Sequence, residues 1–146
     1  MIAYILVPGL AWFMAELAKR LIFANYNKQR KVLGQPIPNR LVLPSGGMPS
    51  AHTASLAALV ASVGLNEGID GALFGISLWF AAVVVYDAVM VRKSSGDQGD
   101  ALNELIVEQK SKVKKPRIAH GHSIAEVAVG GALGSIIALV VFFATK

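Results

Sequence analysis

Four long apolar stretches divide the chain, and each predicts a helix. They run from Ile2 to about Ala24, from Ala51 to about Ile69, from Ala72 to Val91, and from Ile124 to Phe143. Because roughly 20 helical residues cross a hydrocarbon core about 30 Å thick, the third and fourth stretches are long enough to span a membrane. The first is longer and ends in charged residues, and the second is short for a full span. The pattern predicts an all-α integral membrane protein, a compact bundle of about four transmembrane helices in one domain, residues 1–146.

A further helix is predicted in the polar sequence between the third and fourth stretches. There, "DQGDALNELIVEQKSK" places Ala101, Leu102, Leu105 and Ile106 on one helical stripe. Its acidic residues come early and its lysines late, which suits the helix dipole. We expect an interfacial helix on the cytoplasmic side that lies on the membrane or on the bundle. The alternative is a plain connector whose charged residues form a solvated face.

The composition also favours a membrane protein. Of the 146 residues, 54% are hydrophobic and only 16% are charged, and the mean hydropathy is +0.54. These values lie outside the usual range of soluble domains. The chain has no cysteine, which excludes disulfides and thiolate metal sites or nucleophiles.

The basic residues behind the net charge of +5 are concentrated in two loops. The loops after the first and third stretches are rich in Lys and Arg, whereas the connection "NEGIDG" between the second and third has none. By the positive-inside rule the two basic loops are cytoplasmic, and both termini lie with "NEGIDG" on the opposite side. Basic loops suit anionic lipid headgroups, and nucleic acid is not an expected partner because basic and aromatic residues do not interleave.

This topology brings three polar segments to the cytoplasmic face. "GGMPSAH" opens the second helix, "YDAVMVRK" closes the third, and "HGHSIAEV" opens the fourth. In the last segment, His122 and Glu126 are four residues apart and would share one helix face. The carboxylate would hold one ring nitrogen and leave the other as a nucleophile or base. The alternative is a polar pair at the start of a helix, at the headgroup boundary.

The segment "GGMPSAH" has the features of an anion site. Gly46 and Gly47 permit a turn with exposed N–H groups, and a helix that starts near Ser50 adds its positive end. His52, in the first turn, would lie close enough to protonate a leaving oxygen. Proline and serine also occur at helix starts where no ligand binds.

Charged residues close the third stretch. Asp87 lies inside the membrane edge, where ionisable side chains are costly and are functional candidates. It would position an arginine, bind a metal or orient His52. Arg92 and Lys93 would bind phosphate, or would form the ordinary basic flank that fixes topology. Arg117 is a further candidate phosphate ligand.

The last apolar stretch contains Gly130 and Gly134, which are four residues apart. This spacing is typical of close helix contact in membranes. Packing within the monomer and formation of a homo-oligomer explain it equally well.

Taken in order, the three segments resemble motifs of the type 2 phosphatidic acid phosphatase superfamily, and specifically its small divergent branch, related to acid phosphatases and vanadium-dependent haloperoxidases. "GGMPSAHTA" resembles the Pro-Ser-Gly-His motif, with Ala51 in the glycine place. "GHSIAEVAVGGALG" is similar to the His-x-x-x-Asp motif, with Glu126 in the aspartate place, and "YDAVMVRKSSGDQGDALNEL" is similar to a stretch typical of the divergent branch. The superfamily's first motif, a Lys followed by an Arg-Pro pair, has no clear counterpart, because Arg40 is followed by Leu41.

The resemblance implies hydrolysis of a phosphate ester with no metal and no other cofactor. His122 would attack phosphorus, oriented by Glu126, and His52 would protonate the leaving group. The phosphate oxygens would be held by Gly46, Gly47, Ser50, Arg92, Lys93 and Arg117. The implied substrate is a membrane lipid phosphate or pyrophosphate, isoprenyl or phosphatidate-type, bound at the cytoplasmic face.

Three other functions fit the same residues. A lipid-phosphate binding or transport protein would use the basic side chains without cleaving the lipid. A structural bundle would carry its histidines at the interface with no ligand. A metal-dependent enzyme would place the ion on Asp87 together with His52 or His122.

Overall fold

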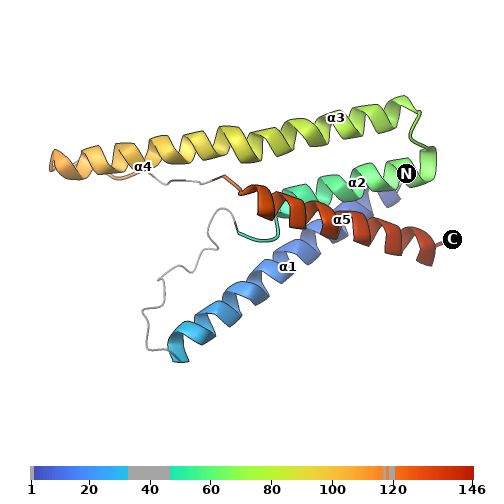
Figure 1. The fold of residues 1–146 in the computed structure, drawn as a ribbon, viewed down its shortest axis with the longest axis horizontal. Helices are drawn as coiled ribbons and strands as arrows, with labels where there is room; N and C mark the ends of the chain where they lie inside the picture. The colour runs from blue at the N-terminus through green and yellow to red at the C-terminus, as the bar shows by residue number, and fades with distance from the viewer. Residues whose placement is uncertain (1, 33–46, 117, 119–120) are drawn as a thin grey trace.

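The computed structural model describes residues 2–32, 47–116, 118 and 121–146, and within these ranges the secondary structure is helical. The elements are α1 (Ala3–Val32), α2 (Ala51–Glu67), α3 (Ala72–Tyr86), the π-helical segment η1 (Asp87–Val91), α4 (Arg92–Glu108) and α5 (Ile124–Ala144) (Figure 1). The predicted all-α class is confirmed. α1 continues well beyond the predicted end near Ala24, because its polar second half contains good helix formers and neither Gly nor Pro.

α2 is the central helix, and α1, α3 and α5 all pack against it. The closest approach is between α2 and α5. A Cβ atom at Gly130 would collide with the carbonyl oxygen of Ser50, and one at Gly134 would collide with that of Ala54. Packing within the monomer therefore accounts for the two glycines, and the formation of a homo-oligomer stays untested.

Small side chains line the core where these helices cross. The buried cluster consists of Val7, Ala11, Ala15, Ala51, Ala54, Ala58 and Ala138. Helices in a membrane gain little hydrophobic energy from contact with each other, since lipid tails are as apolar as the side chains, so close van der Waals packing of small residues holds them together.

The polar segments gather at one end of the bundle. α1 runs antiparallel to α2, because the Tyr4 hydroxyl donates to Glu67 at the end of α2 while the Lys19 side chain lies beside Gly47, just before α2 begins. Both termini and the connection between α2 and α3 lie at the other end (Figure 1). The packing of the helices thus shows that the polar segments lie together at one end of the bundle. Which compartment that end faces stays a prediction.

Two helices of the described part are long and apolar enough to cross a membrane: the continuous helix Ala72–Glu108 and α5. Two of the about four expected transmembrane helices thus have the length and apolarity of a span, and spans by α1 and α2 stay a prediction. α2 has 17 residues, which is short for a span, and the first charged residues of α1, Glu16, Lys19 and Arg20, end its apolar first part after 13 residues, Ala3 to Ala15.

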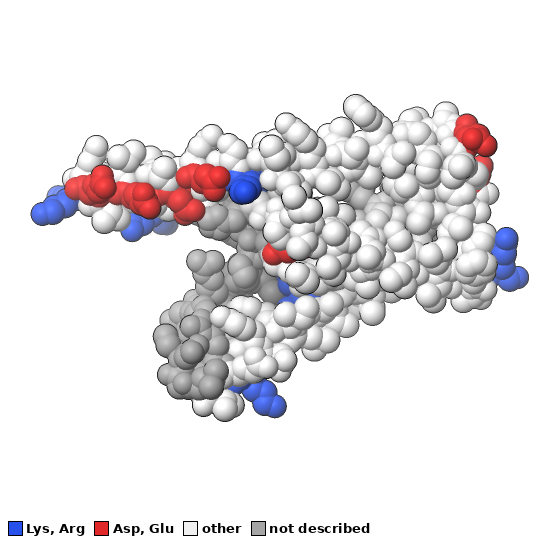
Figure 2. Space-filling model, in the orientation of Figure 1, with Lys and Arg blue, Asp and Glu red and all other residues white. Residues whose placement is uncertain are grey.

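α4 continues α3 and η1 in one helix of 37 residues. Such a helix is about 55 Å long, so α4 extends beyond a hydrocarbon core about 30 Å thick. The helix predicted in the second basic loop thus exists, but it does not pack on the bundle: its Leu102 and Leu105 are about half exposed. Figure 2 shows acidic side chains in a row along it, and Asp97, Asp100, Glu104 and Glu108 are all exposed. An interfacial position of α4 stays a prediction.

Candidate functional site

The pair His122 and Glu126 forms the centre of the candidate site. Nδ1 of His122 lies 3.1 Å from Oε2 of Glu126, and the two side chains are only 10% and 21% exposed. The two residues do not share a helix, because α5 begins at Ile124 with Ser123 as its N-cap. Glu126 instead reaches back over the N-cap to the imidazole ring.

Backbone N–H groups fix the Glu126 carboxylate. Oε2 accepts from Ser123 N at 2.9 Å, and Oε1 accepts from Gly47 N at 3.1 Å. The Glu126 N–H donates to the Ser123 hydroxyl, which completes a capping box. A carboxylate only accepts hydrogen bonds, so Nδ1 of His122 must carry a proton. In a neutral ring Nε2 is then the nitrogen with the free lone pair.

The His122 backbone is held by the π-helical segment. The N–H of Arg92 donates to the Asp87 carbonyl, five residues earlier, and the Ala88 carbonyl accepts from His122 N at 2.9 Å. Single π-helical turns of this kind are frequent at functional sites. A Cβ atom at Gly121 would lie 2.6 Å from both the Ala88 oxygen and the Lys93 nitrogen, so only glycine fits there.

The segment before α2 supports the carboxylate. Gly47 has a φ of 96°, in the left-handed region that favours glycine, and its N–H is taken by Glu126. Ser50 is fully buried; its N–H donates to the Glu126 carbonyl, and its hydroxyl oxygen accepts from Thr53. Both residues thus have structural partners here, and a direct contact with phosphate stays a prediction for each. Gly46 and Arg117, also predicted as phosphate ligands, lie outside the described residues.

Two cations lie near the second histidine. The His52 ring, exposed in the first turn of α2, lies within electrostatic range of Arg92 and Lys19, and also of His122 and Glu16. Nε of Arg92 pairs with Oδ2 of Asp87 at 2.7 Å. This pair agrees with one of the three roles predicted for Asp87, the positioning of an arginine, and the role itself stays a prediction. Lys93, the next residue after Arg92, is also exposed.

Lys19 is a candidate site residue that sequence reasoning missed. Its ammonium group lies 2.9 Å from Oε1 of Glu16, and its side chain is only 13% exposed. The aliphatic part packs beside Gly47, whose Cβ position would be 3.6 Å from Cδ of Lys19. The sequence did contain a signal for this position. Ala11, Ala15 and Lys19 are spaced four residues apart, so Lys19 lies on the same face of α1 as the two buried alanines, the face that packs against α2.

Metal-binding groups do not cluster in the described part of the chain. No three of its His, Asp and Glu side chains lie close enough together to hold an ion. Asp87, the residue on which a metal site was considered, is paired with Arg92 instead.

Comparison with known proteins agrees with the motifs. The profile of the Divergent PAP2 family matches residues 2–137. The chain is also 35% identical over 118 residues to the "Uncharacterized membrane protein YuiD" of Bacillus subtilis (strain 168). This alignment covers 70% of the present chain and 75% of YuiD. No solved structure matches the chain. A relative that is a membrane protein and two long apolar helices together support a membrane location. Because the profile matches nearly the whole chain, the resemblance is confirmed and the chain belongs to the Divergent PAP2 family.

Proposed function

We propose that the protein is a membrane-embedded phosphatase that hydrolyses a lipid phosphate or pyrophosphate through a phosphohistidine, at the cytoplasmic face. The observation that carries the proposal is the His122–Glu126 pair. A carboxylate fixed by backbone N–H groups holds Nδ1, and this leaves Nε2 as a nucleophile with a defined direction. Membership of a phosphatase-related family supports the reaction class.

In the first step, the lone pair of His122 Nε2 forms a bond to phosphorus and the bond from phosphorus to the leaving oxygen breaks. Protonated His52 gives its proton to that oxygen, which releases an alcohol, or a lipid monophosphate where the substrate is a pyrophosphate. The His122 ring becomes positive, and the Glu126 carboxylate stabilises this charge. Water then attacks the phosphohistidine, His52 takes its proton, and the P–N bond breaks to release inorganic phosphate.

Cations at the open face would hold the phosphoryl oxygens. Arg92, oriented by Asp87, and Lys93 would reach the phosphate from the start of α4, and Lys19 would reach it from α1. The salt bridge from Arg92 to Asp87 is exposed, so it adds little stability, but it limits the directions that the guanidinium can take. Lys19 would supply, from a different place in the sequence, the basic group that the missing first motif would provide.

The test is phosphate release from a panel of lipid phosphates and pyrophosphates by the purified protein in detergent, with chelator present. We expect turnover in the wild type and none in His122→Gln, because glutamine can accept a hydrogen bond but cannot form a phosphohistidine. A fluorescent lipid phosphate should bind to both proteins, which shows that the variant is folded. Turnover that survives in His122→Gln would contradict the mechanism.

The alternative is a protein that binds or transports a lipid phosphate without cleaving it. Such a protein would use the same cations, Lys19 and Arg92, but would not need a free lone pair on Nε2 of His122. Binding without turnover of any lipid in the wild type would favour this alternative.

A further inference from the structure

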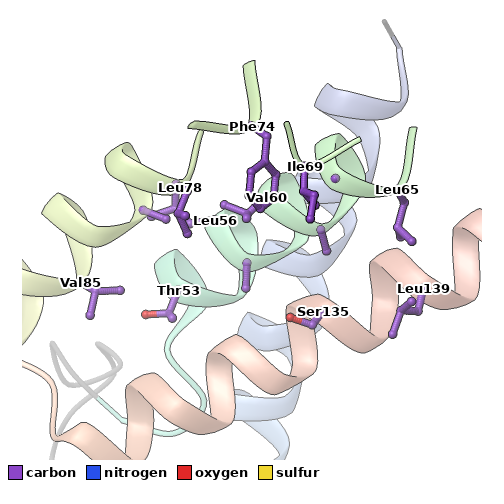
Figure 3. A pocket seen from close by; sticks show the side chains of 14 residues that line it. Thr53, Leu56, Val60, Leu65, Ile69, Phe74, Leu78, Val85, Ser135 and Leu139 are labelled. Atoms are coloured by element: carbon purple, nitrogen blue, oxygen red, sulfur yellow. The ribbon is translucent and has the colours of Figure 1, made fainter. Parts of the chain in front are cut away.

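An apolar groove runs along α2, between α3 and α5 (Figure 3). Its volume is about 540 Å³. The lining contains only two polar side chains, the hydroxyls of Thr53 and Ser135; the rest is aliphatic or aromatic and includes Leu56, Val60, Phe74 and Leu78. A groove with this lining favours a hydrocarbon rather than a polar ligand.

One end of the groove adjoins the candidate site. Thr53 lies in the first turn of α2, and its hydroxyl donates to the Ser50 hydroxyl oxygen. Ser50 in turn bonds the backbone of Glu126. On the opposite wall, Val85 lines the groove two residues before Asp87. A ligand whose polar end is at His52 and His122 therefore has an apolar path open beside it.

The groove follows most of the length of α2. Its lining extends along α2 from Thr53 to Leu65, and at 1.5 Å per residue these positions are about 18 Å apart. The far end lies beside Phe74 and Leu139, at the end of the bundle opposite the site.

The cross-section suits one hydrocarbon chain. A volume of about 540 Å³ along about 18 Å gives a mean cross-section of roughly 30 Å². Carbon atoms in contact are about 3.5–4.0 Å apart, so one extended chain can lie in contact with the lining along this length.

We propose that this groove is the subsite for a single hydrocarbon chain of the substrate, with the phosphate at His122 and the chain end beside Phe74. The inference rests on the proposed function and names its substrate class, a lipid phosphate that presents one chain to the site. A chain that leaves the bilayer for the groove gains little hydrophobic energy, because both surroundings are apolar. The subsite therefore acts mainly by orienting the phosphate against the two histidines.

The kinetic test compares hexadecyl phosphate, in mixed micelles at a fixed surface concentration, with water-soluble butyl phosphate. Ala57→Phe puts a ring into the groove, and Ala82→Phe puts the same ring on the exposed face of α3 as the matched control. We expect the ratio of kcat/KM for hexadecyl phosphate to that for butyl phosphate to fall about tenfold in Ala57→Phe and to stay at the wild-type value in Ala82→Phe. An unchanged ratio in Ala57→Phe, or an equal fall in the control, would overturn the proposal.

A labelling test needs no turnover, so it separates the groove from the phosphatase. Hexadecyl phosphate with a diazirine on its last carbon is photolysed with His122→Gln protein in phosphatidylcholine nanodiscs, and the labelled peptides are mapped by mass spectrometry. We expect label near Leu65, Phe74 and Leu139, and label near Thr53 and Val85 when the diazirine is next to the phosphate. Equal labelling of the exposed Trp79 and Phe80 would show ordinary lipid around the protein, or a groove that another molecule fills, and would overturn the proposal. Labelling in the groove without hydrolysis of any lipid by the wild type would retain the subsite and reject the phosphatase.

Discussion

At the scale of single residues, Glu126 has two functions that the sequence presented as alternatives. It is the N3 residue of the capping box of α5, and it also holds the ring of His122. The capping box favours glutamate, whose longer side chain reaches back to the N-cap. This gives a physical reason for Glu126 where the superfamily motif has aspartate. The pair is therefore both a helix start and an oriented imidazole.

The ring of His122 is oriented mainly by backbone groups. Its partner, the Glu126 carboxylate, accepts from two backbone N–H groups, and the backbone N–H of His122 donates to the Ala88 carbonyl. Charge-assisted bonds from backbone groups are among the stronger hydrogen bonds in proteins. The site is thus pre-organised by the backbone, whereas the surrounding cations are side chains with exposed ends.

Lys19 gives the first prediction at this scale. In Lys19→Met we expect kcat/KM for a lipid phosphate to fall about tenfold to a hundredfold, since a hydrogen bond to a charged group contributes about 1.5–3 kcal/mol. Lys28→Met, which removes an exposed charge from the same helix, is the matched control and should leave kcat/KM unchanged. The measurement is phosphate release, with the melting temperature recorded in parallel.

Removal of Lys19 also leaves Glu16 without its partner, so a loss of stability must be separated from a loss of function. Glu16→Gln combined with Lys19→Met removes both charges and should restore the melting temperature without restoring turnover. Lys19→Arg, which keeps the charge, should retain part of the activity. If the double variant regains both, Lys19 is only a basic flank of α1.

At the scale of elements, the contact between α2 and α5 determines whether the site exists. α5 carries Glu126 and the segment before α2 carries Gly47, and their hydrogen bond requires the two helix starts to be close. Gly130 and Gly134 permit this approach, because their missing side chains leave space for the backbone of Ser50 and Ala54. A membrane bundle has little other force to hold the helices at this distance.

Gly134→Ala tests this contact. The added methyl group collides with the Ala54 carbonyl, so we expect a loss of about 1–3 kcal/mol of stability and a matching fall in the melting temperature in detergent. Gly131→Ala is the matched control on the same helix, because its Cβ would make an ordinary contact of 3.7 Å with Thr53. We expect Gly134→Ala to lose turnover as well, since α5 must move away from Gly47. Equal melting temperatures for the two variants would show that the close approach is not important.

Helix positions were largely predictable from the sequence. The predicted starts at Ala51, Ala72 and Ile124 agree with the structure, because a clear polar-to-apolar change coincides with a serine cap at Ser50 and Ser123. The end of α1 was not found, since apolarity was used as the guide and its second half is polar but helical. The continuation of α3 into α4 was also missed, because the change from apolar to polar sequence after Val91 was taken as the end of a helix. No proline is present there, and the helix continues to Glu108.

The site was predictable only in part. The spacing of His122 and Glu126 indicated their contact, and the loop charges indicated that three segments meet at one end of the bundle. The contact of Lys19 with Gly47 and the bond from His122 to Ala88 depend on how the helices cross, which hydropathy does not determine. The π-helical segment likewise has no clear sequence signal, since "DAVMV" would also form an ordinary α-helix.

At the scale of the whole molecule, the two ends of the bundle differ in their content of Lys and Arg. The site end carries Lys19, Arg92 and Lys93, and the connection after α4 adds Lys110, Lys112, Lys114 and Lys115. The opposite end carries Glu67 at the end of α2, Asp70 in the connection to α3, and the basic residue Lys146 after α5 (Figure 2). Because basic loops are retained in the cytoplasm, this asymmetry predicts that the site opens to the inner leaflet.

The absence of cysteine allows a direct measurement of this orientation. Single cysteines are introduced at Ser111, on the site side, and at Thr145, near the C-terminus; both residues are exposed and neither substitution changes the loop charge. In intact cells a membrane-impermeant maleimide should label Thr145→Cys, and it should label Ser111→Cys only after the membrane is permeabilised. The reverse pattern would place the two histidines on the outer side, so a phosphatase would then act on lipids of the outer leaflet and the charge rule would fail for this bundle. Labelling of both variants in intact cells would mean that α5 does not cross the membrane, which would contradict the bundle as a membrane-spanning unit.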